Sequence, residues 1–222
     1  MYKSLFEKEW LKIRWVLLAY AIISLSVLIY IISDLHHSFE MKGAIKNWLA
    51  VIIHHKSYFS SLKYIPVIGG FAVAIFQFVP ESFENRFRLS FHLPLNEIKL
   101  LLFMLVIGVT SILLVDIITI LGFIFASSGF FTVEIVNASF QTMIPWFMGG
   151  IVTYLGIATV TVEPNWYQRI ILALVTYFAM SLYFQGTGYK QYNHVLDVYL
   201  IPALLFTITI LFPGHRLRKG AK

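Results

Sequence analysis

The most informative part of the sequence is a short charged segment, about residues 81–92, which lies between Pro80 and Pro94. Its charged side chains are Glu81, Glu84, Arg86 and Arg88. Phenylalanines recur at every fourth position from Phe83 to Phe91, so that they would share one face of a helix. Apolar residues also alternate from Phe87 to Leu93, which is a strand pattern. We favour the helix, because a lone strand beside a membrane has no partner with which to pair.

An isolated carboxylate, Asp116, lies within the apolar run from Leu100 to Ala126. Ionisable side chains are costly at membrane depth, and those that occur there usually have a function or a partner. Two interpretations remain open: Asp116 lines a transport pathway, or it forms a hydrogen bond with a neighbouring helix. Gln77 and Gln185 are weaker polar candidates, because they lie near the ends of apolar runs.

Histidines and one glutamate that follow the first apolar run could suggest a metal site. They are His36, His37, Glu40, His54 and His55. His36 and Glu40 would share a helical face, which is a possible spacing for metal ligands. Adjacent histidines diverge by about 100° around a helix, so neither pair chelates as a unit. We therefore expect solvated histidines and no metal site.

Known catalytic signatures are absent from the sequence. There is no cysteine, no G-x-x-x-x-G-K-[ST] phosphate loop, no G-x-S-x-G and no H-E-x-x-H. An intramembrane protease with paired glutamates is a weak alternative, since Glu81 and Glu84 are not adjacent and no clear set of intramembrane histidines accompanies them. We expect no catalytic residue and no cofactor in this chain.

The composition predicts an integral membrane protein. Hydrophobic residues make up 59% of the 222 residues and charged residues only 13%, whereas a soluble domain carries about 25% charged residues. Six apolar segments have close to the ~20 residues that a helix needs to cross a bilayer. They run over about residues 15–33, 64–80, 100–126, 143–162, 169–185 and 195–213. We expect one all-α transmembrane domain over residues 1–222, formed by a six-helix bundle.

The lysines and arginines predict the orientation in the membrane. The net charge is +6, and the basic residues cluster beside apolar segments, which favours anionic lipid over nucleic acid as their partner. With the N-terminus inside, twelve basic residues lie on the cytoplasmic side and five outside, and all six arginines are inside. Because cytoplasmic loops carry the excess of lysine and arginine, we expect a multi-pass protein of the cell membrane with both termini cytoplasmic.

Residues 2–14 have the pattern of an amphipathic helix that lies in the membrane interface. Apolar residues recur at helical spacing, and most charged residues fall on the other side. The apolar residues are Tyr2, Leu5, Phe6, Trp10 and Ile13, and the charged ones are Lys3, Glu7, Lys8 and Lys12. Glycines within the predicted spans, such as Gly69, Gly70, Gly108 and Gly150, are expected to let helices pack closely.

These features together resemble the permease subunits of ABC transporters of the type-2, exporter-like class. Such permeases typically have a glutamate after the second span, a short cytoplasmic helix, a Leu-Pro pair and a basic residue that enters the third span. The matching residues here are Glu81, Ser82, Arg86, Leu89, His92, Leu93, Pro94, Leu95 and Lys99. The run from Phe6 to Arg14 resembles the interfacial elbow helix of that family, and six spans with both ends inside also match.

The resemblance implies a subunit that couples ATP hydrolysis in a partner to the movement of a substrate across the membrane. Two permease copies or homologues would pair and dock on two cytoplasmic ATPase subunits, which would bind ATP and Mg²⁺. The coupling contacts would be Glu81, Glu84, Arg86 and Arg88, with Phe83 and Phe87 as apolar anchors. Lipids, glycans, peptides, drugs and ions are all substrates of such systems, and the sequence does not choose among them.

Two other functions fit the same composition. One is a secondary transporter or channel-like protein that uses Asp116 as its coupling site. The other is a membrane assembly subunit that transports nothing itself, in which case the charges near residue 86 would merely face water. A stable complex with a nucleotide-binding subunit would distinguish the permease from the secondary transporter.

Overall fold

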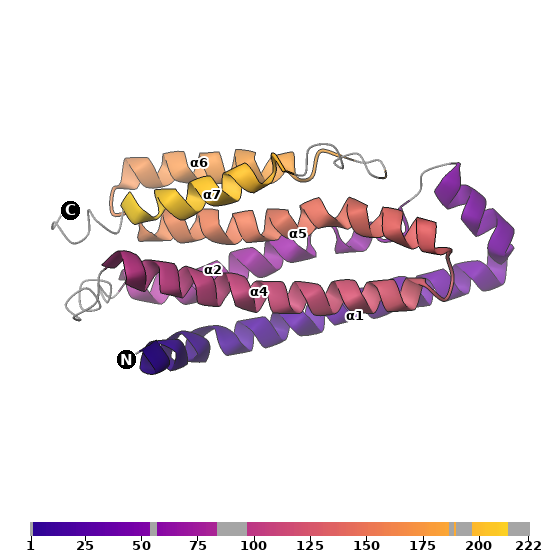
Figure 1. Cartoon of the computed structure of the whole chain (residues 1–222), viewed down its shortest axis with the longest axis horizontal. Coiled ribbons are helices and arrows are strands. Elements are labelled where there is room, and N and C mark those ends of the chain that lie inside the picture. Colours follow the sequence, from indigo (N-terminus) through magenta and orange to yellow (C-terminus); the bar gives the residue numbers. More distant parts are fainter. Residues whose placement is uncertain (1, 54–56, 84–96, 187–188, 190–196, 213–222) are drawn as a thin grey trace.

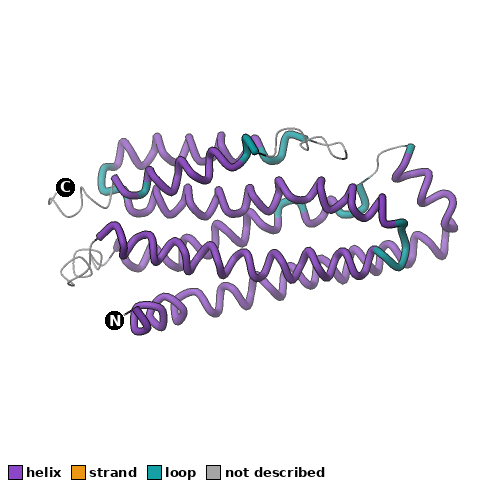
Figure 2. Tube along the Cα trace, viewed as in Figure 1, coloured by secondary structure: helices purple, strands orange, loops and turns teal. Residues whose placement is uncertain are grey.

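The computed structural model describes residues 2–53, 57–83, 97–186, 189 and 197–212. Its α-helices are α1 (Tyr2–Ile52), α2 (Ile65–Phe83), α4 (Glu97–Ser127), α5 (Val133–Val162), α6 (Trp166–Leu182) and α7 (Leu200–Thr209), and a short 3-10 helix, η1, spans Ser60–Leu62. These residues contain no strand, as Figure 2 also shows, so the predicted all-α fold class is confirmed.

The helices run alternately up and down one elongated bundle (Figure 1). At one end, which we name the N-terminal end, α1, α4 and α6 begin and α2, α5 and α7 finish. The opposite end, the distal end, holds the last turns of α1, η1 and the connection between α4 and α5. α5 is the central helix and packs against α2, α4, α6 and α7, whereas α1 packs against α2 and α4.

A stripe of buried residues explains how α1 and α4 pack together, because on each helix the stripe recurs every three or four residues. On α1 the stripe comprises Leu5, Glu9, Ile13, Leu17, Tyr20, Ser24, Leu28, Ile31 and Leu35. On α4 it comprises Leu101, Leu105, Gly108, Ile112, Asp116, Thr119, Phe123 and Ser127. Most members are apolar, and two polar ones on α1, Glu9 and Tyr20, form the contacts described below.

α1 continues far beyond the predicted end of the first span at residue 33. It bends at Gly43, whose φ of 75° and ψ of 163° lie outside the helical region and favour glycine. Asn47 bridges the bend: its amide nitrogen donates to the carbonyls of Ser38 (2.9 Å) and Gly43 (3.2 Å), and it accepts from the Ser38 hydroxyl at 2.8 Å. The bend is therefore a specific turn held by side-chain hydrogen bonds.

Close glycine contacts hold the helices against one another. A Cβ on Gly70 of α2 would lie 2.1 Å from the carbonyl oxygen of Gly150 on α5, so these two backbones touch. Gly69 lies against the ring of Tyr20 on α1, where an added Cβ would be 2.4 Å from the ring. The prediction that these glycines serve close packing is confirmed within the bundle.

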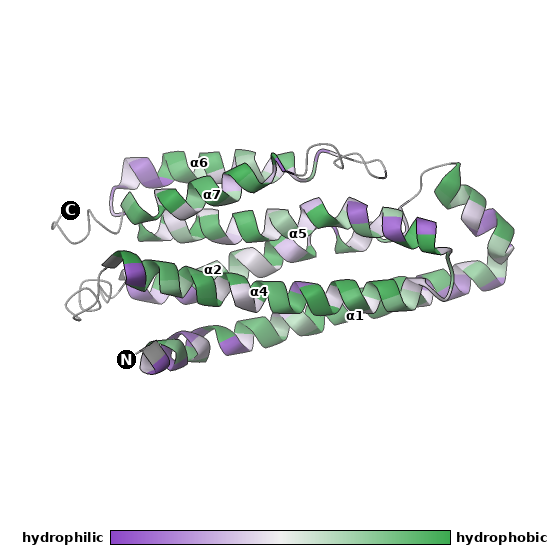
Figure 3. Ribbon diagram, in the orientation of Figure 1, coloured by the Kyte–Doolittle hydropathy of each residue, from purple (hydrophilic) through white to green (hydrophobic). Residues whose placement is uncertain are grey.

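Among the residues that the structure describes, four helical segments are long and apolar enough to cross a membrane: Lys3–Ile52, Ser60–Ser82, Ile98–Ser127 and Val133–Val162. Hydrophobic residues cover most of their length in Figure 3. α6 has 17 residues and α7 has 10, which is fewer than the ~20 needed for a perpendicular crossing. Residues 2–14 form one helix with the first span, so a separate interfacial helix is not confirmed.

Candidate functional site

A buried cluster of charged and polar side chains lies at the N-terminal end, where α1 meets α2. Glu9 belongs to the buried stripe of α1 and is completely inaccessible to solvent, as is Gln77 of α2. Glu81, one turn further along α2, is only 1% exposed. A carboxylate removed from water in this way needs a cation and hydrogen bonds to stay charged.

Lys12 supplies that cation to both carboxylates. Its Nζ lies 2.6 Å from Oε1 of Glu9 and 2.6 Å from Oε1 of Glu81, and the side chain is 15% exposed. Lys8 adds a second contact to Glu81 at 2.8 Å. The four groups carry two positive and two negative charges, so the cluster is electrically balanced although it is largely withdrawn from water.

Hydrogen bonds extend the cluster into the centre of the bundle. Gln77 Nε2 donates to Oε2 of Glu9 (3.2 Å) and to the carbonyl oxygen of Met104 on α4 (2.9 Å). The hydroxyl of Tyr154, on α5, donates to Oε1 of Gln77 at 2.8 Å. Gly108 makes room for this pair, because a Cβ there would lie 1.9 Å from the Tyr154 hydroxyl. The charge network therefore ties together α1, α2, α4 and α5.

Among the residues predicted to couple the chain to an ATPase, the structure describes both the backbone and the side chain of Glu81. This residue lies near the end of α2 and belongs to the charge network. Phe83 is the last residue of α2. The other predicted contacts, Glu84, Arg86, Phe87 and Arg88, lie outside the described residues. The helix expected over about residues 81–92 stays a prediction beyond Phe83.

Sequence reasoning did not single out Glu9, Lys8 and Lys12 as site residues. Lys8 and Lys12 were placed on the polar face of an interfacial helix, whereas Lys12 is largely buried against α2. The signal that identifies Glu9 is its position on the stripe of α1, four residues from both Leu5 and Ile13. A charged residue at a core position needs a partner, and the facing helix provides it.

A second buried polar contact joins α1 and α4 near the middle of the bundle. The Tyr20 hydroxyl donates to Oδ1 of Asp116, which is 2% exposed. Among the described residues, Oδ2 of Asp116 and the hydroxyl of Ser24 have no hydrogen-bond partner. Of the two interpretations of Asp116, the geometry provides the contact with a neighbouring helix, and a role in transport is untested.

The Tyr20→Phe variant is expected to lower the free energy of unfolding by about 1–3 kcal/mol, because it leaves the buried Asp116 carboxyl without its donor. Removing both groups in Tyr20→Phe/Asp116→Leu should cost less than the sum of the single changes. Unfolding of the purified chain in detergent would measure both. Tyr30→Phe is the matched control, since Tyr30 is 63% exposed; equal losses for Tyr20→Phe and Tyr30→Phe would contradict the assignment.

The candidate metal ligands do not converge within the described part of the chain. His36 Nδ1 lies 3.4 Å from Oε1 of Glu40, so the two share a helical face as predicted, and both side chains are exposed. No group of three or more histidine, aspartate or glutamate side chains that could hold a metal ion occurs among the described residues. His54 and His55 lie outside that part.

No protein-family model, curated protein or solved structure matches this sequence. The class of protein is therefore defined by its own fold and composition. In the described part of the chain, four helices of membrane-spanning length and hydropathy within an all-α bundle indicate an integral membrane protein.

Proposed function

We propose that this chain is the membrane-spanning permease subunit of an ATP-driven exporter of the ABC type. In this proposal α1, α2, α4 and α5 are the first four spans, and α6 and α7 are the fifth and sixth. The up-and-down bundle supports six crossings, because α7 finishes at the end where α1 begins (Figure 1). Both termini would then be cytoplasmic.

Exposed aromatic and basic residues support the assignment of the N-terminal end to the inner leaflet. Trp15 and Trp166 are 66% exposed there. Arg14 lies over the Trp15 ring and Arg169 over the Trp166 ring, at 5.4 and 5.8 Å from the ring centroids. Tryptophan is typical of the headgroup level, and arginine of the cytoplasmic side.

The observation that carries the proposal is the double ion pair of Lys12 with Glu9 and Glu81. Glu81 lies two residues before the end of α2, next to the segment that would dock on the ATPase. A force applied to that segment would pass through Glu81 to α1, and through Gln77 to α4 and α5. In this proposal Glu81 links the docking segment to the spans, and Glu84, Arg86, Phe87 and Arg88 make the surface contacts.

Co-purification tests the proposal directly. The tagged full chain, extracted from its native membrane in mild detergent, should bring down a subunit with a Walker-type phosphate loop. Reconstituted into nanodiscs, that complex should hydrolyse ATP. The Arg86→Glu/Phe87→Ala double variant is expected to lower complex formation about tenfold or more, as for the loss of an interface hot spot.

Lys63→Gln is the control for that experiment, because it also removes a positive charge but lies at the distal end, over the Tyr64 ring. It should leave both the complex and the ATPase rate unchanged. A chain that purifies without any nucleotide-binding subunit, and catalyses ion-driven flux alone, would refute the proposal.

A secondary transporter that uses Asp116 is the second candidate, favoured by the unpartnered Oδ2 of a buried carboxyl group. In that case Asp116→Asn would abolish ion-driven flux through vesicles that contain the chain alone. The permease proposal predicts no such flux from either the parent chain or the variant.

A further inference from the structure

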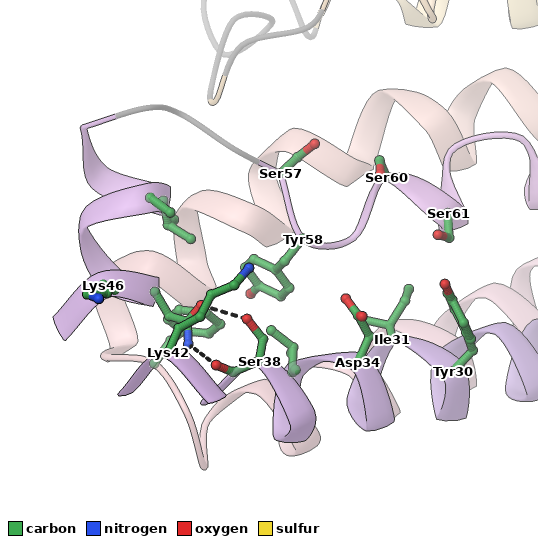
Figure 4. Close-up of a pocket in the computed structure, with 15 residues that line it drawn as sticks. Tyr30, Ile31, Asp34, Ser38, Lys42, Lys46, Ser57, Tyr58, Ser60 and Ser61 are labelled. Carbon is green, nitrogen blue, oxygen red and sulfur yellow. Dashed lines mark hydrogen bonds between the residues drawn. The ribbon is translucent and has the colours of Figure 1, made fainter. Parts of the chain in front are cut away.

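The distal end contains a polar cavity of about 220 Å³ between α1 and the segment that carries η1 (Figure 4). Its wall includes Tyr30, Asp34 and Lys42 from α1 and Tyr58, Ser60 and Ser61 from the following segment. In Figure 4, Asp34 and Tyr30 point from α1 toward the serines, while Lys42 extends toward Tyr58. This cavity is separate from the charge network, which lies at the N-terminal end.

One acidic and two basic side chains, Asp34, Lys42 and Lys46, line the cavity, and no ion pair joins them. Asp34 and Lys42 are eight residues apart on α1, about 12 Å along a helix axis. Within the described part of the chain, no basic group lies within ion-pair distance of Asp34. Burial raises the pKa of the Tyr58 hydroxyl, so the Tyr58 side chain stays uncharged. A ligand that carries an anionic group and a cationic group could pair with the lysines through the first and with Asp34 through the second.

The position of the cavity along α1 places it at the depth of lipid headgroups. Residues 15–33 carry no charged side chain, and at 1.5 Å per residue they cover about 28 Å, close to the thickness of the hydrocarbon core. Asp34 is the first charged residue after them. On the same helix as Tyr30, Ile29 is 64% exposed and Leu25 41% exposed, which leaves an apolar helix surface for acyl chains.

We propose that this cavity binds the headgroup of a zwitterionic phospholipid with a primary ammonium group, of the phosphoethanolamine type. The phosphate would lie beside Lys42 and accept from the serine hydroxyls, and the ammonium would donate to Asp34. A trimethylammonium headgroup has no N–H to donate to Asp34, and an anionic headgroup without an amine has no cation to pair with Asp34. This assignment goes beyond the proposed transport function and does not depend on it.

Native mass spectrometry of the purified full chain in detergent would test the site. The chain is titrated with short-chain phosphatidylethanolamine, phosphatidylcholine and phosphatidylglycerol. We expect phosphatidylethanolamine to bind about tenfold more tightly than the other two, the difference that one hydrogen bond to a charged group provides. Asp34→Asn should remove the preference over phosphatidylglycerol, and Asp34→Glu should retain part of it.

Lys42→Gln should weaken binding of both phosphatidylethanolamine and phosphatidylglycerol, whereas Lys63→Gln, outside the cavity wall, should change neither. Asp34 and Lys42 are exposed, so these variants should keep the parental helix content and melting temperature. Equal binding of all three lipids, or an unchanged preference in Asp34→Asn, would overturn the proposal. Displacement of the lipid by free phosphoethanolamine at equal concentration would overturn the assignment to a lipid.

Discussion

Replacing Lys12 by methionine is expected to lower the free energy of unfolding by about 3–5 kcal/mol, the usual loss when one partner of a buried ion pair is removed. Methionine keeps most of the length and apolar surface of the lysine stem, so the change isolates the charge. Glu9, which is completely buried, would then keep Gln77 as its hydrogen-bond donor and have no cation. Glu81 would still be paired with Lys8.

A second substitution separates this electrostatic loss from a simple packing defect. In Lys12→Met/Glu9→Gln the stranded carboxylate becomes a neutral amide, and the remaining Lys8–Glu81 pair is balanced. The double variant should therefore recover at least half of the lost stability. Lys3→Met is the matched control in the same helix, because Lys3 is exposed. Unfolding of the purified chain in detergent is the measurement, and a double variant less stable than Lys12→Met would refute the network.

Composition and periodicity were sufficient to predict an all-α membrane protein, because the sequence has six long apolar segments. Within the described residues, four helices are as long as a bilayer is thick, so the count of six spans stays a prediction. The same reasoning misplaced the end of the first helix, which lies at the distal end of the bundle. The first span was expected to end at residue 33, but α1 continues to Ile52. The sequence suggested a loop after residue 33, because it contains the charged residues Asp34, Lys42 and Lys46. A helix keeps its backbone hydrogen bonds whether or not its side chains are charged, however, and such residues lower helix stability only slightly.

The site was only partly predictable, because its partners come from distant parts of the sequence. Glu81 and Asp116 stood out through their position beside or within apolar runs. Their partners Lys12 and Tyr20 did not stand out. A lysine in an amphipathic segment is expected to face water, and a tyrosine in a span is expected to pack against its neighbours. Only the packing of α1 against α2 and α4 brings these residues together, and that packing is not encoded in local spacing.

The buried stripe of α1 links the two polar contacts. Its polar members are Glu9, Tyr20 and Ser24, and the first two meet polar groups on facing helices. A purely apolar stripe would let α1 rotate or slide by a turn at little cost, whereas paired polar groups fix one register. We infer that the network fixes α1 in register with α2 and α4, as the proposed coupling role would require.

Replacing Gly70 by alanine is expected to lower the free energy of unfolding by about 3 kcal/mol, at the upper end of the usual cost of overpacking. The added Cβ would lie 2.1 Å from the carbonyl oxygen of Gly150 and 3.0 Å from its carbonyl carbon. Both atoms belong to the backbone of α5, so no rotamer change can relieve the overlap. α2 must move away from the central helix, and contacts along the α2–α5 interface weaken together.

Two other glycines provide a graded comparison in the same chain. At Gly122 an added Cβ meets only Cδ2 of Leu28, at 2.9 Å, and that flexible side chain can turn away, so Gly122→Ala should cost less than about 1 kcal/mol. At Gly129 the nearest atom is the Ala126 carbonyl oxygen at 3.7 Å, and Gly129→Ala should be neutral or slightly stabilising. Thermal unfolding of the three variants in detergent should rank Gly70→Ala as the least stable. A Gly70→Ala chain as stable as Gly129→Ala would mean that α2 and α5 do not approach at this point, and the central packing of the bundle would then be wrong.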